Sequence, residues 1–148
     1  MGDAIISRFS STPWAASLIN DAKWTPANTP SRVFKPTGED SFFAETLSTD
    51  RTMRTCLTLR PAKAPEGDWP YQEIVTLVEI GDGLNGYPQI IHGGFAATML
   101  DEVCGVLIQL NTTAKVEQLE KSGRPGPHTR ASYFTACLSH RYRGYRHV

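Results

Sequence analysis

Residues 90–110 read Ile-Ile-His-Gly-Gly-Phe-Ala-Ala-Thr-Met-Leu-Asp-Glu-Val-Cys-Gly-Val-Leu-Ile-Gln-Leu, and this stretch decides the fold of the 148-residue chain. It predicts a strand-like pair, a turn at Gly93 and Gly94, and then a helix. Almost every position from Phe95 to Leu110 is apolar or small, so the pattern predicts a helix inside the molecule rather than on its surface. The helix is expected to be too short and too charged to span a membrane.

Two carboxylates interrupt this apolar helix, at Asp101 and Glu102. Burying an ionised carboxylate costs free energy unless it has a partner or a function. Helical spacing surrounds Asp101 with small side chains, which leaves room for a substrate: Ala97, Thr98, Cys104 and Gly105. Asp101 is therefore a candidate catalytic group, and the alternative is a carboxylate that caps or pairs inside the core. Glu102 points in another direction and is interpreted as solvated or paired.

The two glycines precede the helix and supply the second half of the predicted chemistry. The first backbone N–H groups of a helix have no acceptor within the helix. Those of Gly93 and Gly94 are therefore candidates to hold a carbonyl oxygen as it becomes negative. His92 is either a polar group near that carbonyl or a loop histidine that forms ordinary hydrogen bonds.

The spacing of these groups predicts more than one chain in the site. Gly93 and Asp101 are eight residues apart, which is roughly 12 Å along a helix axis. One carbonyl cannot contact both groups of the same helix. We therefore expect the carboxylate to come from a second, antiparallel copy, which predicts a homodimer or a higher oligomer with sites at its interface.

The sequence His-Gly-Gly at 92–94, followed after six residues by Asp101, resembles the HGG-x6-D/E signature of hotdog-fold acyl-CoA thioesterases of the PaaI-like group. The flanking residues 81–91 are most similar to the fungal branch of that group. The resemblance covers roughly Phe42 to Tyr142. It implies an α+β hotdog fold, in which an antiparallel sheet wraps a long central helix, and it implies hydrolysis of an acyl thioester.

The resemblance also assigns roles by position. It implies that Asp101 is the general base or nucleophile, that Gly93 and Gly94 are the oxyanion donors, and that His92 is a polar group near the carbonyl. Family members often have Ser or Thr four residues after the carboxylate, but this chain has Gly105. That Ser or Thr helps to hold water, and the expected substitute is Thr98, a predicted substrate-binding residue, or a hydroxyl from elsewhere.

The basic tail that follows the predicted last strand has two interpretations. Arg141 and Arg143 match a strand end of the family, and their guanidinium groups would contact the phosphates of coenzyme A; the alternative is a solvated terminus. The tail is too short and isolated to predict nucleic-acid binding. The four histidines lack metal-ligand spacing, and the proposed chemistry needs no metal or cofactor beyond coenzyme A in the substrate.

The composition of the chain indicates which binding partners and which cellular compartment to expect. Fifteen basic and fifteen acidic residues balance, so no net field recruits nucleic acid or an anionic membrane. Three widely spaced cysteines indicate a reducing compartment, and Cys104 is expected to be inert packing rather than a nucleophile. The first residues lack a secretory pattern, and a cytoplasmic location is expected.

The chain divides into an arm, residues 1–36, and a partial hotdog domain, residues 37–148. In the arm, Pro13 can start a short helix to Asn20 that buries Trp14, Leu18 and Ile19. The arm either packs on the outside of the domain or forms a lid over the acyl site. The other expected elements are two strands within 42–59 broken near Asp50, a loop at 61–70, a strand at 73–80, a connection at 81–88 that delivers His92, a helix continuing to Leu119 before Gly123, and a strand at 132–138.

The match to the family fails after Arg143, where further strands of the family would complete the sheet. The sheet is therefore expected to be incomplete at the C-terminus, as in a truncated form. Part of the apolar helix would then stay exposed or be covered by another chain.

The sequence thus favours an enzyme that hydrolyses acyl-CoA or acyl-carrier thioesters, in fatty-acyl housekeeping or in a secondary-metabolite (polyketide) pathway. The alternatives are a non-catalytic hotdog module that binds acyl groups or a partner, and an inactive truncated product. A hydratase of the same fold is disfavoured because its Asp/His motif is not visible.

Overall fold

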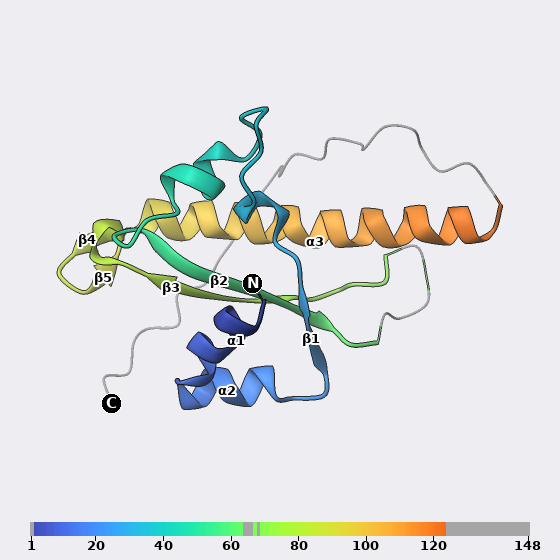
Figure 1. Ribbon diagram of the computed structural model, residues 1–148, viewed down its shortest axis with the longest axis horizontal. Coiled ribbons are helices and arrows are strands. Elements are labelled where there is room, and N and C mark those ends of the chain that lie inside the picture. Colours follow the sequence, from blue (N-terminus) through green and yellow to red (C-terminus); the bar gives the residue numbers. More distant parts are fainter. Residues whose placement is uncertain (1, 64–66, 68, 124–148) are drawn as a thin grey trace.

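An antiparallel sheet and one long helix form the centre of the computed structural model, which describes residues 2–63, 67 and 69–123 (Figure 1). The elements follow the order α1 (Gly2–Ser10), α2 (Pro13–Ile19), β1 (Trp24–Ala27), η1 (Pro30–Arg32), η2 (Phe42–Thr46), β2 (Met53–Pro61), β3 (Val75–Ile80), η3 (Asp82–Leu84), β4 (Asn85–Tyr87), β5 (Ile90–Ile91) and α3 (Gly93–Lys121). The main sheet has the order β1-β2-β3, and β4 pairs with β5 in a separate hairpin.

The central strand, β2, sorts its side chains to the two faces of the sheet. Leu57 pairs with Leu77, and the next residue, Cys56, pairs with Val78. Because strand side chains alternate, the leucines face one layer and Cys56 faces the other. The predicted strand at 73–80 is confirmed as β3. The Gly81 that follows β3 approaches the Arg51 backbone so closely that a Cβ would lie 2.5 Å from its carbonyl carbon.

The prediction of two strands within 42–59 is wrong for the first of them. Residues Phe42–Thr46 form a π-helical turn, in which the Leu47 N–H donates to the Phe42 carbonyl at 2.8 Å. Arg32 donates to the carbonyls of Phe43 and Leu47, and this turn brings both to the same guanidinium. The sequence also gave no indication of β1, whose Pro26 is tolerated because β1 is an edge strand of the described sheet.

Helices α1 and α2 of the arm cover the sheet face opposite α3, as Figure 1 shows, whereas β1 of the arm is a strand of the sheet. Phe9 of α1 and Ala15 of α2 are buried against Leu57, Leu59 and Leu77. The sheet therefore separates α1 and α2 from α3, which matches an arm that packs on the outside rather than a lid. The predicted helix after Thr12 is confirmed as α2.

The predicted burial of Trp14 is wrong, since this side chain is 63% exposed. Ala15 takes the inner position of α2 and is fully buried, with Leu18 and Ile19 packed beside it. Positions 15, 18 and 19 form one stripe at helical spacing, and position 14 lies outside that stripe.

Helix α3 lies along the other face of the sheet and is held at both halves. Phe95 packs in a cluster with Leu47 and Met53. Farther along, buried Asn111 accepts a hydrogen bond from the Tyr71 N–H at 2.8 Å and donates to the Tyr71 carbonyl at 2.9 Å. The Asn111 side chain thus satisfies both backbone groups of Tyr71, as a neighbouring strand would, in the segment that leads into β3.

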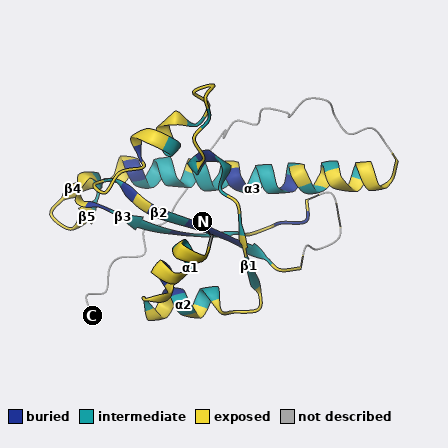
Figure 2. Ribbon diagram, in the orientation of Figure 1, coloured by how far each residue is buried: buried dark blue, intermediate teal, exposed yellow. Residues whose placement is uncertain are grey.

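Part of the surface of α3 is uncovered, mainly at its start, at Asp101 and Gly105, and over its last turns. Of its 29 residues only Phe95, Val106 and Asn111 are buried, and Figure 2 shows intermediate and exposed positions along the rest. The prediction of a helix enclosed inside the molecule is therefore wrong for this chain, whereas the expected uncovered surface is present. The predicted continuation past Leu119 is confirmed, and Gly123 follows with φ +70°.

The length of α3 also corrects one expectation. At 29 residues the helix is long and apolar enough to cross a membrane, although it was expected to be too short. Length and composition alone establish no membrane span, and Phe95 of this helix is buried in a cluster with Leu47 and Met53.

The arrangement is α+β and hotdog-like, because one long helix runs along an antiparallel sheet. The described strands do not close into a barrel. The predicted strand at 132–138 lies outside the described residues.

Candidate active site

The start of α3 is a capped helix end held by the β4–β5 hairpin. The His92 N–H donates to the Leu84 carbonyl at 2.8 Å, so the hairpin connection fixes the residue that precedes the helix. The Gly94 N–H donates to Nδ1 of His92 at 3.0 Å. His92 is therefore the N-cap, and one of the two predicted oxyanion amides, that of Gly94, already has an acceptor.

Gly93 is the first residue of α3, and its N–H has no acceptor within the helix. It lies on an exposed part of the chain, as does His92. The positive end of the helix dipole adds to the attraction of this amide for a developing negative charge. Of the two glycines, Gly93 is thus the one whose amide is free to bind a carbonyl oxygen.

Asp101 lies on the exposed side of α3, two turns after the helix start. The expectation of a carboxylate lodged in apolar surroundings is therefore wrong for Asp101 in the single chain. The face around it is open, because a Cβ added at Gly105 would meet nothing within 4 Å. The Thr98 hydroxyl, one turn before, donates to the Gly94 carbonyl at 3.0 Å and so keeps only its acceptor positions for a ligand.

A single chain does not bring the predicted site residues together. Residues 92–94 gather at the start of α3, whereas Asp101 lies about 12 Å farther along the same axis. Arg141 and Arg143 lie outside the described residues. Among the residues that the structure describes, no three His, Cys, Asp or Glu side chains form a group that could hold a metal ion.

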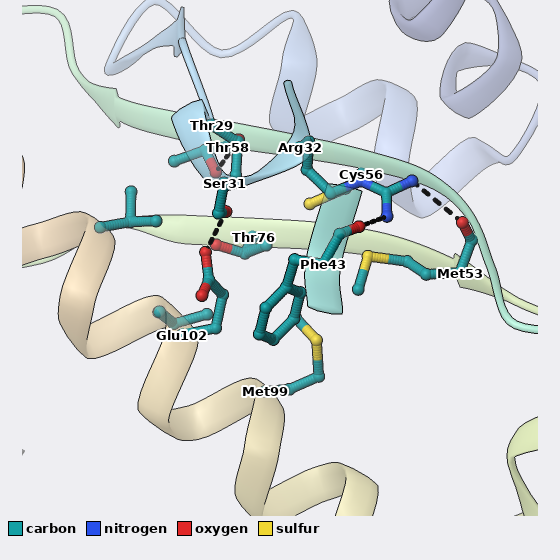
Figure 3. Close-up of a pocket in the computed structure, with 12 residues that line it drawn as sticks. Thr29, Ser31, Arg32, Phe43, Met53, Cys56, Thr58, Thr76, Met99 and Glu102 are labelled. Carbon is teal, nitrogen blue, oxygen red and sulfur yellow. Dashed lines mark hydrogen bonds between the residues drawn. The ribbon is translucent and has the colours of Figure 1, made fainter. Parts of the chain in front are cut away.

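Glu102, the neighbour of Asp101, faces the sheet and belongs to a polar cluster that the sequence did not reveal (Figure 3). Ser31 Oγ donates a hydrogen bond to Glu102 Oε1, so the interpretation of Glu102 as a paired carboxylate is confirmed. The Thr29 and Thr58 hydroxyls lie 2.9 Å apart nearby. These side chains line a cavity of about 10 Å³, which has room for about one water molecule but none for a substrate.

Arg32 fixes the chain around this cavity. Its Nη1 donates to the Phe43 carbonyl at 2.6 Å and to the Leu47 carbonyl at 3.3 Å. Its Nη2 donates to the Met53 carbonyl at 3.0 Å and to Ser48 Oγ at 3.2 Å. One half-buried guanidinium thus joins η1, η2 and the start of β2. Burial lowers the pKa of Arg32, which nonetheless remains a cation at physiological pH.

Cys56 also lines the cavity, and burial raises the pKa of its thiol to about 11. The thiol is therefore protonated at neutral pH and is not a nucleophile. Cys104 is half-buried on α3. No cysteine nucleophile is needed for the chemistry that the helix start suggests.

The environment of Glu102 predicts a pH-dependent contribution to stability. Burial raises the pKa of Glu102 above its ordinary value of 4.5, and the charges of Asp40 and Asp101 raise it further, while the Ser31 hydrogen bond opposes them. The folded state thus holds this proton more tightly than the unfolded state. The contribution favours folding below about pH 4.5 and is lost as pH rises through the folded pKa.

A Glu102→Gln variant should therefore gain stability over the wild type at pH 7.5, and this gain should shrink as pH falls toward 4.5. Urea unfolding of both proteins at several pH values measures the difference. A difference that stays constant with pH would show that Glu102 has the same pKa in both states.

A larger groove of about 460 Å³ lies beside the second half of α3. Arg60 and Tyr71 line one side of it, and Arg60 donates to the Tyr71 hydroxyl at 3.0 Å. Residues from Val106 to Glu117 line the other side. Among the described residues, none of the predicted site residues lines this groove.

Comparison with known proteins yields one partial match. Verlamelin biosynthesis protein B from Lecanicillium sp. is 34% identical to this chain over 74 residues, which cover 47% of this chain and 32% of that protein. The match thus spans about a third of the relative's length. No family model matches the chain, and no solved structure matches it.

Proposed function

We propose that this protein hydrolyses an acyl thioester, with coenzyme A or an acyl carrier as the thiol. The observation that carries the proposal is the start of α3, where a free Gly93 amide follows the His92 cap and an exposed carboxylate, Asp101, lies on the same helix. In thioester hydrolysis an amide donor can stabilise the oxyanion and a carboxylate can activate the attacking water. The resemblance of residues 92–101 to the PaaI-like thioesterases supports the same reaction.

In this mechanism the thioester carbonyl oxygen accepts a hydrogen bond from the Gly93 N–H. Asp101 removes a proton from water, whose oxygen attacks the carbonyl carbon. The negative charge that develops on the carbonyl oxygen is stabilised by the amide and the helix dipole. The C–S bond then breaks, and the thiolate leaves and takes up a proton, which yields a carboxylic acid and a free thiol. Direct attack by the Asp101 carboxylate is the alternative first step.

The proposed site needs two chains. Because Gly93 and Asp101 are about 12 Å apart along α3, a second copy must supply the carboxylate. The uncovered face of α3, with Asp101 and Gly105 open to solvent, supports a second helix packed there in the opposite direction. Each site would then combine the helix start of one protomer with the Asp101 of its partner.

The biological setting is part of the proposal. The partial match to a verlamelin biosynthesis protein supports a role in a biosynthetic pathway of secondary metabolism. In such a pathway the reaction would release an acyl or polyketide chain from its carrier. The chemistry uses a carboxylate and backbone amides, so we propose no cofactor apart from the coenzyme A of the substrate.

The direct test is thiol release from a panel of acyl-CoA substrates of different chain length, followed with a thiol-reactive dye. We expect release above the uncatalysed rate for at least one acyl class, with saturation at increasing substrate concentration. Acyl-CoA binding, measured by calorimetry, without thiol release from any substrate would contradict hydrolysis. That result would instead favour the second candidate, a non-catalytic acyl-binding module.

A further inference from the structure

Gly86, in the middle of β4, lies directly against His92. A Cβ added at Gly86 would lie 3.2 Å from the Cα and 3.3 Å from the ring Cδ2 of His92. Such distances are tighter than ordinary van der Waals contact, so His92 would have to move by a few tenths of an ångström to admit a methyl group. The hairpin backbone therefore limits where the His92 ring can lie.

A second glycine limits the same ring from its other edge. A Cβ added at Gly94 would lie 2.9 Å from Nδ1 and 3.1 Å from Cε1 of His92. The Gly94 N–H donates to that Nδ1 at 3.0 Å. His92 is therefore held by two hydrogen bonds, from its N–H to the Leu84 carbonyl and from the Gly94 N–H to its Nδ1, and both glycines leave the space that its ring occupies.

The reason for glycine at both positions is space. Neither Gly86 nor Gly94 has a φ in the left-handed region, unlike Gly38, Gly67 and Gly123. Other residues could therefore adopt the backbone conformation of Gly86, but their side chains would displace the imidazole. The His92 ring can occupy its observed position because Gly86 has no side chain.

We propose that Gly86 is a positioning residue that acts through His92. Because it lacks a side chain, Gly86 leaves room for the imidazole in the orientation in which Nδ1 accepts from the Gly94 N–H, so that the neutral ring carries its proton on Nε2. The cap occupies the Gly94 amide, which leaves Gly93 as the free donor, and the exposed ring presents one defined N–H beside it. The importance of this geometry for turnover rests on the proposed thioester hydrolysis, whereas the ring state itself does not.

The test uses Gly86→Ala, His92→Ala and the double variant in the full chain. In the His92-containing background, Gly86→Ala should lower kcat by about 5- to 10-fold, since small misplacements of reacting groups are costly, while KM changes less than 2-fold. In the His92→Ala background the contact with the ring Cδ2 is gone while the contact with the Cα remains, so Gly86→Ala should lower kcat by clearly less than in the His92-containing background. An equal loss in both backgrounds would overturn the proposal, because Gly86 would then act through the hairpin alone.

A spectroscopic measurement separates this inference from the proposed function. Long-range ¹H–¹⁵N correlation spectra of the His92 ring should show the proton on Nε2 in the wild type. In Gly86→Ala and in Gly94→Ala the ring nitrogen signals should shift toward a mixture of tautomers. Unchanged ring signals in Gly86→Ala would overturn the proposal. Shifted signals support the positioning role of Gly86 even if no acyl-CoA is hydrolysed, in which case only the proposed function fails.

Discussion

Asp101→Asn is expected to slow thiol release by at least about 100-fold on the best substrate of the panel, because positioned acid–base groups contribute 10²–10⁴-fold to a rate. Asparagine keeps the size of the side chain but cannot accept the proton of the attacking water. Since Asp101 is exposed on α3, the variant should fold like the wild type. The measurement is kcat/KM from initial rates of thiol release, with KM and kcat determined separately.

The chain offers a matched control in the adjacent residue. Glu102→Gln makes the same neutralising change one residue later, but Glu102 faces Ser31 and the sheet rather than the open side of α3. We expect Glu102→Gln to retain kcat/KM within about 3-fold, well below the usual contribution of an acid–base group. Equal losses in the two variants would assign the effect to the charge of the helix, and an unchanged rate in Asp101→Asn would remove that residue from the mechanism.

Mixing two inactive chains tests whether the site spans two protomers. Gly93→Pro removes the proposed donor N–H, and proline is favoured at the first position of a helix. The His92 backbone, at φ −66° and ψ 130°, is already in the range that precedes proline. If partner chains supply Gly93 and Asp101, random pairing of Gly93→Pro with Asp101→Asn chains should restore about a quarter of wild-type activity, since half of the dimers carry one intact site. No restoration, with mixed dimers shown to form, would contradict a site that combines Gly93 of one protomer with Asp101 of its partner.

Arg32→Ala is expected to cost about 3 kcal/mol of unfolding free energy and to lower Tm by about 6–12 °C. The reason is that one guanidinium donates to three backbone carbonyls and a hydroxyl, and it lies half-buried at the junction of η1, η2 and β2. Removing it leaves acceptors without donors in a region with little water. Urea unfolding followed by tryptophan fluorescence measures the change.

Arg51→Ala is the control, because Arg51 is the same residue type with a side chain 76% exposed and a 3.4 Å ion pair to Asp82. Exposed pairs of this kind contribute less than about 1 kcal/mol. Arg32→Lys keeps the charge without the planar fork and should recover less than half of the loss. Similar losses for Arg32→Ala and Arg51→Ala would contradict a specific role of the Arg32 hydrogen bonds.

Local sequence patterns predicted the elements whose signals lie within a few residues. The apolar run with Gly93 at its start and Gly123 at its end marked α3, Pro13 marked α2, and the alternation before Gly81 marked β3. Strand β1 and the turn at Phe42–Thr46 were missed or misassigned. Strand β1 depends on pairing with β2, and the turn depends on Arg32, so neither has a purely local cause.

For the candidate site, too, the sequence predicted some features and not others. Residues 92–94 and Asp101 were identified from their types and spacing, because the need for amides and a carboxylate is a property of the chemistry. The direction of each carboxylate was not predictable, since periodicity alone did not show which stripe of an almost uniformly apolar helix would contact the sheet. Contacts of Phe95 and Val106 with the rest of the fold turned Glu102 toward Ser31 and left Asp101 in solvent.

By itself, the sequence determined that a long apolar helix begins at two glycines and carries a carboxylate two turns later, because helix starts, stops and spacings are local properties of the chain. Only the tertiary structure decided that the His92 side chain accepts from the Gly94 N–H, that Gly86 leaves room for the His92 ring, and that Arg32 donates to carbonyls of a distant turn. These contacts join residues whose closeness depends on how β2, the hairpin and α3 pack, and packing is decided by the whole chain at once.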